Sequence, residues 1–289
     1  MNKHLIRKDS GKNIMKKVVD YLEFIRPKNI IFGLILLFSG IFIGGDPPWF
    51  SVQVIIALLS FSFAIAGSLA FNNYVDRDID KIIHPRRPLP SGRLSPKEGL
   101  YFGIIVFIVS FLLALFVNLS FFIMLILGFC LCLLYELIAK NHGLYGNILV
   151  AVVIAGVSVT GGFVVDNPNP GFFISLVLFP QLLGGEIIRD VRDIEGDRLR
   201  RKTLPMIIDK NLTLYIGLYL IATTFFMIPI PFITYTVGIW YIPGISFVVF
   251  FILLGIGLSL KNKDNLNLTT KITKAAMVLT ILAFFLGSL

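Results

Sequence analysis

The sequence predicts an all-α polytopic membrane protein: a bundle of nine transmembrane helices around a central cavity, with the N-terminus in the cytoplasm. Composition is the first indication, because 56% of the 289 residues are hydrophobic and only 15% are charged, outside the range of soluble domains. Apolar residues also gather in nine runs of roughly 17–23 residues, about the length that crosses a bilayer as a helix. Finally, the 26 Lys and Arg residues occur only in the N-terminal tail and in alternate connections, as the positive-inside rule expects.

The nine apolar runs are expected to be helices, because backbone groups in lipid need hydrogen-bond partners within their own segment. Their weak two-residue alternation excludes a transmembrane β-barrel. In chain order the runs cover residues 29–45, 51–71, 99–117, 119–138, 146–165, 171–188, 213–232, 238–260 and 270–288. The third and fourth runs are separated only by Asn118 and its neighbours, which predicts a tight helical hairpin.

The basic residues set the expected orientation. They lie within residues 1–28, 72–98, 139–145, 189–212 and 261–274, and the intervening loops contain none. We therefore expect a multi-pass protein of the cell membrane with these segments in the cytoplasm. This bias, together with phosphate binding, accounts for the formal charge of +9, so no nucleic-acid partner is expected.

The chain divides at the start of the first run. Residues 1–28 are interpreted as a cytoplasmic and interfacial segment, in which 13–28 are expected to form a short helix at the membrane surface. Residues 29–289 are expected to be one transmembrane domain. Cys130 and Cys132 lie inside an apolar run and are interpreted as packing residues rather than a metal or redox site.

Two acidic motifs follow apolar runs and share helical spacing. The first is NNYVDRDID and the second is RDVRDIEGD. Their acids recur at three- or four-residue intervals and would share one helix face. Oxygen ligands of this kind suit Mg²⁺ held jointly with a phosphate-bearing substrate. The expected ligands are Asn72, Asp76, Asp80, Asp190, Asp193 and Asp197.

Basic residues follow both motifs, which favours a diphosphate site in which Arg and Lys bind phosphate oxygens. The candidates are Arg86, Arg87, Arg189, Arg201 and Lys202, with Glu186 one turn before the second motif. A solvated, ion-paired surface is the alternative interpretation. A Ca²⁺-binding EF-hand loop at Asp76 is excluded, because Lys81 stands at the Gly position and Arg87 at the Glu position.

These motifs resemble those of the UbiA-type intramembrane prenyltransferases. The family pattern N-D-x-x-D-x-x-x-D is matched by Asn72, Asp76 and Asp80, although Asn73 stands where the family usually has Asp. Its second pattern, D-x-x-D-x-x-x-D, is matched by Asp190, Asp193 and Asp197 within the E-G-D and K-T-L-P context.

The resemblance implies nine helices, Mg²⁺ as cofactor and an isoprenoid diphosphate as donor. It also implies that the motif acids are catalytic, in an active site facing the cytoplasm. The segment YELIAKNHGLYGN resembles the family's Tyr/Lys segment, which adds Tyr135, Lys140 and Asn147 near the diphosphate. Asn73 is expected to orient water or phosphate there.

The acceptor remains open between two classes. Family members that act on hydroxybenzoate usually have an Arg shortly before the first motif, where this chain has Ile65. The stretches HPRRPLPSGRLSP and GGEIIRDVRDIEGD instead resemble archaeal members that alkylate the sn-2 hydroxyl of geranylgeranylglyceryl phosphate, a lipid acceptor. Arg26, Lys28, Arg86 and Arg201 are candidates for its phosphate. A transporter is the alternative from another class, whereas a CDP-alcohol phosphotransferase is excluded because its D-G-x-x-A-R motif is absent.

Overall fold

A computed structural model describes residues 15–46, 50–198, 202–234, 236–263 and 266–289. Nine helices in these residues are long and apolar enough to span a membrane, which confirms an all-helical, multi-pass membrane protein. The spanning helices are α2 (Pro27–Gly44), α3 (Val52–Val75), α5 (Pro96–Ala114), α6 (Leu119–Leu137), α7 (Leu144–Val164), α8 (Asn169–Arg192), α11 (Lys210–Met227), α13 (Tyr241–Lys261) and α14 (Asn267–Gly287). The short helices are α4 (Arg77–Ile83), η1 (Ala139–Asn141), α9 (Ile194–Asp197), α10 (Leu204–Ile207) and α12 (Pro229–Ile233).

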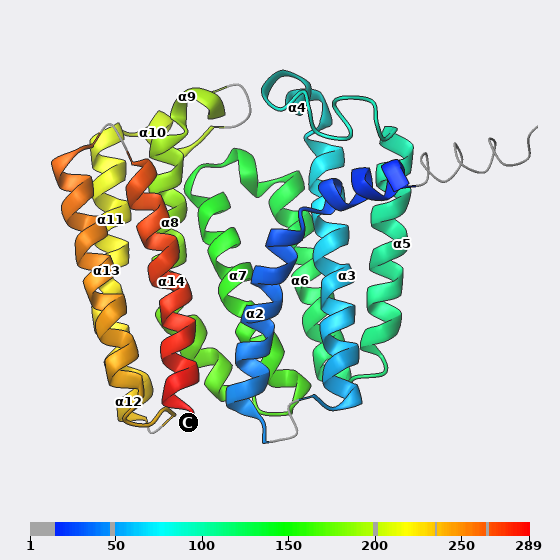
Figure 1. The fold of residues 1–289 in the computed structure, drawn as a ribbon. Helices are drawn as coiled ribbons and strands as arrows, with labels where there is room; N and C mark the ends of the chain where they lie inside the picture. Colours follow the sequence, from blue (N-terminus) through cyan, green and yellow to red (C-terminus); the bar gives the residue numbers. More distant parts are fainter. Residues whose placement is uncertain (1–14, 47–49, 199–201, 235, 264–265) are drawn as a thin grey trace, which may run out of the picture.

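The spanning helices run side by side in one bundle (Figure 1). Helices α4, α9 and α10 gather at one end of the bundle, and α12 and the C-terminus lie at the other. We call the first of these the motif end, because both acidic motifs lie there. The predicted helical hairpin is confirmed: Asn118 caps α6 through a hydrogen bond from Phe121 N to its Oδ1 at 2.7 Å.

Close helix packing depends on glycines and small polar residues. A Cβ on Gly40 would lie 1.8 Å from Ser158 O, and one on Gly161 would lie 2.0 Å from Leu37 O. Only glycine therefore allows α2 and α7 to approach this closely. Between α3 and α5, Ser60 and Ser110 each donate to the other's backbone carbonyl at 2.8 Å, which satisfies both hydroxyls without water.

The N-terminal helix, residues 15–25, lies across the motif end instead of crossing the bundle (Figure 1). Its outer face is apolar and exposed, with Met15, Val18, Val19 and Leu22 about half exposed or more. Its inner face buries Phe24. This division fits the predicted interfacial helix, because one apolar face is left for the lipid surface.

A sharp corner joins the N-terminal helix to α2. Arg26 at this corner has φ 48°, a left-handed conformation that is uncommon for a residue with a side chain. The residue before a proline is sterically disfavoured in the right-handed helical region, and Pro27 begins α2. The helical path therefore breaks here and turns into the membrane.

Candidate active site

Both acidic motifs fold in the same way. In each, a spanning helix ends just before one motif acid and a short helix begins just after it. Asp76 separates α3 from α4, and Asp193 separates α8 from α9. Backbone hydrogen bonds still run four residues back through both junctions, from Asp80 N to Asp76 O and from Asp197 N to Asp193 O. The predicted one-face stacking is therefore preserved across each break.

Three of the five motif acids are more deeply buried than the acids between the motif positions. Asp80, Asp190 and Asp197 are 1%, 1% and 6% exposed. Asp78 lies between the motif positions and is not on their helix face. Its side chain is 67% exposed and pairs with Lys81, and this ion pair lowers the pKa of Asp78. Asp76 and Asp193 are only partly buried, so burial sets apart three of the motif acids and not all five.

The first motif is joined to the end of α6 by a network of charges. Lys140 Nζ lies 2.7 Å from Asp76 Oδ1 and 2.9 Å from Glu136 Oε2. Asn72 Nδ2 donates to Glu136 Oε1 at 2.6 Å and to Asp76 Oδ2 at 3.3 Å. Lys140 thus lies beside the first motif, where sequence analysis expects it. Glu136 was not expected, because an acid at the end of an apolar run gives no signal of its partners.

The second motif is joined to α7. Asn147 Nδ2 donates to Asp190 Oδ2 at 2.8 Å, and Arg192 Nη2 lies 2.6 Å from Asp193 Oδ2. Lys140 and Asn147 belong to one corner, formed by the end of α6, η1 and the start of α7. This corner contacts both motifs, which supports the expectation that the Tyr/Lys segment lies at the site.

Asn73 holds the N-terminal helix. Its Nδ2 donates to Phe24 O at 2.8 Å, and its Oδ1 accepts from Arg26 Nη2 at 2.5 Å. An aspartate could not make the first of these bonds, because an ionised carboxylate has no donor. Asn73 therefore makes a structural contact that an aspartate could not make, while its expected role toward water or phosphate stays a prediction.

A small polar cavity of about 270 Å³ lies beside this contact, lined in part by Asn73, Arg26, Asp80 and Arg87. Arg87 Nη1 lies 2.7 Å from Asp80 Oδ2. Arg26 and Arg87, predicted to bind the acceptor phosphate and the diphosphate, therefore contact the first motif or its neighbour.

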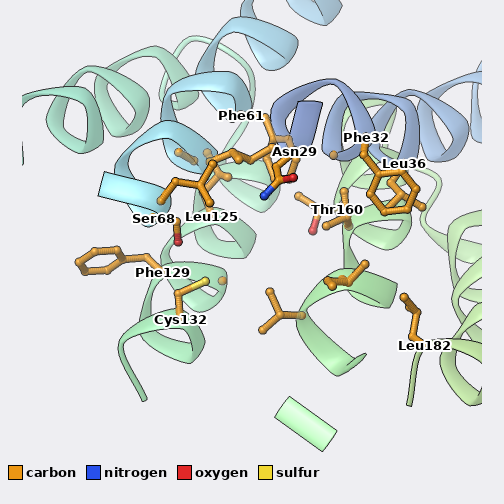
Figure 2. A pocket seen from close by; sticks show the side chains of 18 of the residues that line it. Asn29, Phe32, Leu36, Phe61, Ser68, Leu125, Phe129, Cys132, Thr160 and Leu182 are labelled. Carbon is orange, nitrogen blue, oxygen red and sulfur yellow. The ribbon is translucent and has the colours of Figure 1, made fainter. Parts of the chain in front are cut away.

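A larger cavity, about 630 Å³ in volume, lies between α2, α3, α5, α6, α7, α8 and α14. Its wall is mainly apolar, with Phe32, Phe61, Leu125, Phe129 and Leu182 around the space shown in Figure 2. Glu186, Arg189 and Lys274 also line it. Arg189 Nη1 lies 2.9 Å from Glu186 Oε1. Lys274, like Glu136, is not singled out by the sequence. The positive-inside rule accounts for every basic residue near this end of the bundle and so does not distinguish the one that lines the cavity.

The remaining predicted residues are less enclosed. Arg86, Lys28 and Lys202 are exposed, and Tyr135 is half-buried. Arg201 lies outside the described residues. None of these positions by itself tests the predicted role.

The motif side chains offer carboxylate and amide oxygens, the donor set that Mg²⁺ prefers. Within the described parts of the chain, no three His, Cys, Asp or Glu side chains form a group that could hold a metal ion. Lys140, Arg87 and Arg192 instead contact carboxylate oxygens of Asp76, Asp80 and Asp193. The ligand chemistry therefore fits Mg²⁺, while the ligand roles of the individual acids stay predictions.

Comparison with known proteins decides the family. The model of the UbiA prenyltransferase family matches residues 33–287. The chain belongs to the UbiA prenyltransferase family. Digeranylgeranylglyceryl phosphate synthase of Methanocaldococcus jannaschii is 30% identical over 95% of this chain and 98% of that protein. The protein of the same name from Methanosphaera stadtmanae is 29% identical over 93% and 99%.

Solved structures agree on the fold of this UbiA family member. A structure of digeranylgeranylglyceryl phosphate synthase in membranes superposes with a TM-score of 0.80, at 29% identity over 94% of this chain and 98% of that one. A UbiA homologue from Archaeoglobus fulgidus bound to GPP and Mg²⁺ gives a TM-score of 0.74, at 22% identity over 92% and 98%. At that identity, the second likeness shows the fold alone.

Proposed function

We propose that this UbiA family member transfers a geranylgeranyl group from its diphosphate to the sn-2 hydroxyl of geranylgeranylglyceryl phosphate. The observation that carries the proposal is an apolar cavity whose lining includes Glu186 and Arg189, directly before the Asp190 motif on α8. A long isoprenoid gains about 0.8 kcal/mol for each CH₂ that it buries. The charged residues on α8 suit the phosphate groups of the donor and the acceptor, and the relatives' names supply the acceptor.

The geometry suggests how the chain assists the reaction. As the bond from C1 to the diphosphate oxygen breaks, negative charge grows on the leaving group, and Lys140 is placed beside Asp76 to offset it. Positive charge grows on the allylic carbon, which aromatic faces such as Phe61 and Phe129 can stabilise. The acceptor hydroxyl then forms the ether bond to C1 and passes its proton to the departing diphosphate, which is released in protonated form.

Mg²⁺ is the cofactor in this proposal, as in the A. fulgidus homologue bound to GPP and Mg²⁺. When bound, Mg²⁺ would neutralise the diphosphate as it leaves. Asp76, Asp80, Asp190, Asp193 and Asp197 would hold it, with Asn72 beside them. Asp76 accepts hydrogen bonds from Lys140 on Oδ1 and from Asn72 on Oδ2, so metal binding at Asp76 would compete with these contacts.

An aromatic acid is the less favoured acceptor. Ile65 lines the large cavity at the place where hydroxybenzoate-specific members usually have an Arg. An aryl carboxylate would therefore meet an apolar wall there, which costs several kcal/mol for an unpaired charge. We assign the motif end to the cytoplasm, because the basic residues lie at that end, and the helix of residues 15–25 to its interface with the membrane. Residues 1–14 of the predicted interfacial segment 1–28 lie outside the described residues.

The test uses purified protein with labelled geranylgeranyl diphosphate and Mg²⁺. We expect diphosphate release and a doubly alkylated product only when geranylgeranylglyceryl phosphate is added, and loss of both with excess chelator. Release that depends instead on an aromatic acid would replace the acceptor in this proposal. No release with any acceptor, together with solute uptake into vesicles, would favour a transporter.

A further inference from the structure

One cation in the large cavity is left without a carboxylate. Arg189 pairs with Glu186, and Arg192 pairs with Asp193. Lys274 interacts electrostatically with all four of these groups. Among the described residues, no carboxylate oxygen lies within 4.0 Å of its ammonium. This part of the cavity wall therefore carries one more positive than negative charge.

Contacts between α8 and α14 place Lys274 level with Arg189. Gln181 Nε2 donates to Thr280 Oγ1 at 3.0 Å, and Arg192 Nη1 donates to Thr270 Oγ1 at 2.9 Å. Between these contacts the two helices run antiparallel, so Arg189 lies opposite residues 273–274. Both cations line the cavity, and together they suit an anion better than either does alone.

The positive-inside rule alone does not explain why a lysine stands at position 274. Lys274 lies seven residues into α14, about 10 Å along its axis, and faces the cavity. Lys271, one turn nearer the helix start, is exposed like Lys274, but it does not line the cavity and suffices as a topology marker. A cation at the edge of an apolar cavity suits an amphiphile with an anionic head.

We propose that Lys274, together with Arg189, binds the phosphate of the acceptor lipid and so fixes the position of its hydroxyl. The inference rests on the proposed function. In glycerol phosphate the phosphate and the reacting hydroxyl lie on adjacent carbons, so holding one positions the other. Lys274 reaches the cavity from α14, whereas Asp190 of the donor site is hydrogen-bonded to α7. The two phosphate groups would thus lie along α8 beside different neighbouring helices, α14 and α7.

Steady-state kinetics of Lys274→Met, with Lys271→Met as the matched control, test this assignment. We expect the KM for geranylgeranylglyceryl phosphate to rise about tenfold or more, the usual effect of losing one charged hydrogen bond. The KM for geranylgeranyl diphosphate should stay within about twofold. Lys274→Arg should restore much of the loss, and Lys271→Met should behave as wild type.

Geranylgeranylglycerol, the same acceptor without phosphate, provides the internal control for folding. Wild type and Lys274→Met should use it equally poorly, because neither gains from a phosphate contact. If Lys274→Met is too unstable to purify, Lys274→Gln serves in the same comparison.

Equal losses with both acceptors, or a matching rise in the KM for the donor, would overturn the assignment. Wild-type kinetics in the variant would also overturn it while leaving the proposed function intact. If wild-type protein does not use geranylgeranylglyceryl phosphate at all, the proposed function itself fails.

Discussion

At the scale of single residues, Asn73 shows how an amide replaces a carboxylate for a structural reason. It uses both ends of its side chain, one for Phe24 O and one for Arg26. Asn73 is only 6% exposed, so water reaches it poorly and is a weak replacement for a lost partner. The N-terminal helix therefore depends on this side chain as both a donor and an acceptor.

We predict that Asn73→Asp lowers stability but keeps Mg²⁺-dependent turnover. The carboxylate would face Phe24 O without a donor, at a cost of about 1–3 kcal/mol, while the motif acids stay in place. The measurement is the thermal unfolding midpoint in detergent, beside the turnover rate. A higher midpoint in the variant would show that the Phe24 contact contributes nothing.

We predict that the ammonium of Lys140 neutralises the acids around the first motif when no Mg²⁺ is bound. Lys140→Met leaves Asp76 and Glu136 without their ammonium partner, and breaking such a buried pair costs about 3–5 kcal/mol. We expect its midpoint without metal to fall well below that of wild type, and added Mg²⁺ with donor to raise it more than in wild type.

The matched control for Lys140 is Lys81→Met, which removes an exposed ion pair with Asp78, because exposed pairs contribute little to stability. Equal midpoint losses in the two variants would contradict the special position of Lys140. An Mg²⁺ response no larger than that of wild type would contradict its role in the metal-free protein.

At the scale of elements, the N-terminal helix is held to the bundle by Arg93. The guanidinium Nη1 lies 2.7 Å from Glu23 Oε2 and 2.5 Å from Asp20 Oδ1. The hydrogen bond with Glu23, supported by Asp20, raises the pKa of Arg93, so the charge persists at all physiological pH values. Stacking of Tyr21 against Phe102, with ring centroids 5.0 Å apart, adds an apolar contact.

Removing the two ion pairs of Arg93 should loosen the N-terminal helix without disturbing the bundle. In Arg93→Met we expect backbone hydrogen exchange in residues 15–25 to speed up by about tenfold or more, with α7 and α8 unchanged. Lys17→Met is the control, because its pair with Glu98 is more exposed. Unchanged exchange in Arg93→Met would mean that apolar packing alone holds the helix.

At the scale of the whole molecule, the cavity should limit the length of the isoprenoid. Gly128 on α6 lines it, and a Cβ there would meet nothing within 4 Å. Gly128→Leu should therefore fill part of the cavity and lower kcat/KM for geranylgeranyl diphosphate by about tenfold or more, with a smaller effect on geranyl diphosphate.

Gly257→Leu on α13 is the control for chain length, since a side chain there also meets nothing within 4 Å but is outside the cavity lining. The ratio of kcat/KM for the two donors is the quantity to compare. An unchanged ratio in Gly128→Leu would show that the isoprenoid lies elsewhere.

Much of this architecture is predictable from the sequence, because apolar run length and basic-residue placement are dominated by the bilayer. Helical spacing also separates buried Asp80 from exposed Asp78, but it does not predict that Asp193 is only partly buried. Glu136 and Lys274 are not, because their significance lies in contacts between distant segments. The positive-inside rule also treats every lysine alike, whether it faces water, as Lys271 does, or a cavity.

The central claim is that the two acidic motifs form a single diphosphate site. The most direct measurement is a structure of the protein with an unreactive thio analogue of geranylgeranyl diphosphate and Mn²⁺, located by its anomalous scattering. We expect Mn²⁺ at roughly 2 Å from oxygens of Asp76 and of Asp190, with one diphosphate bridging them. Metal and diphosphate bound to only one motif would contradict the claim.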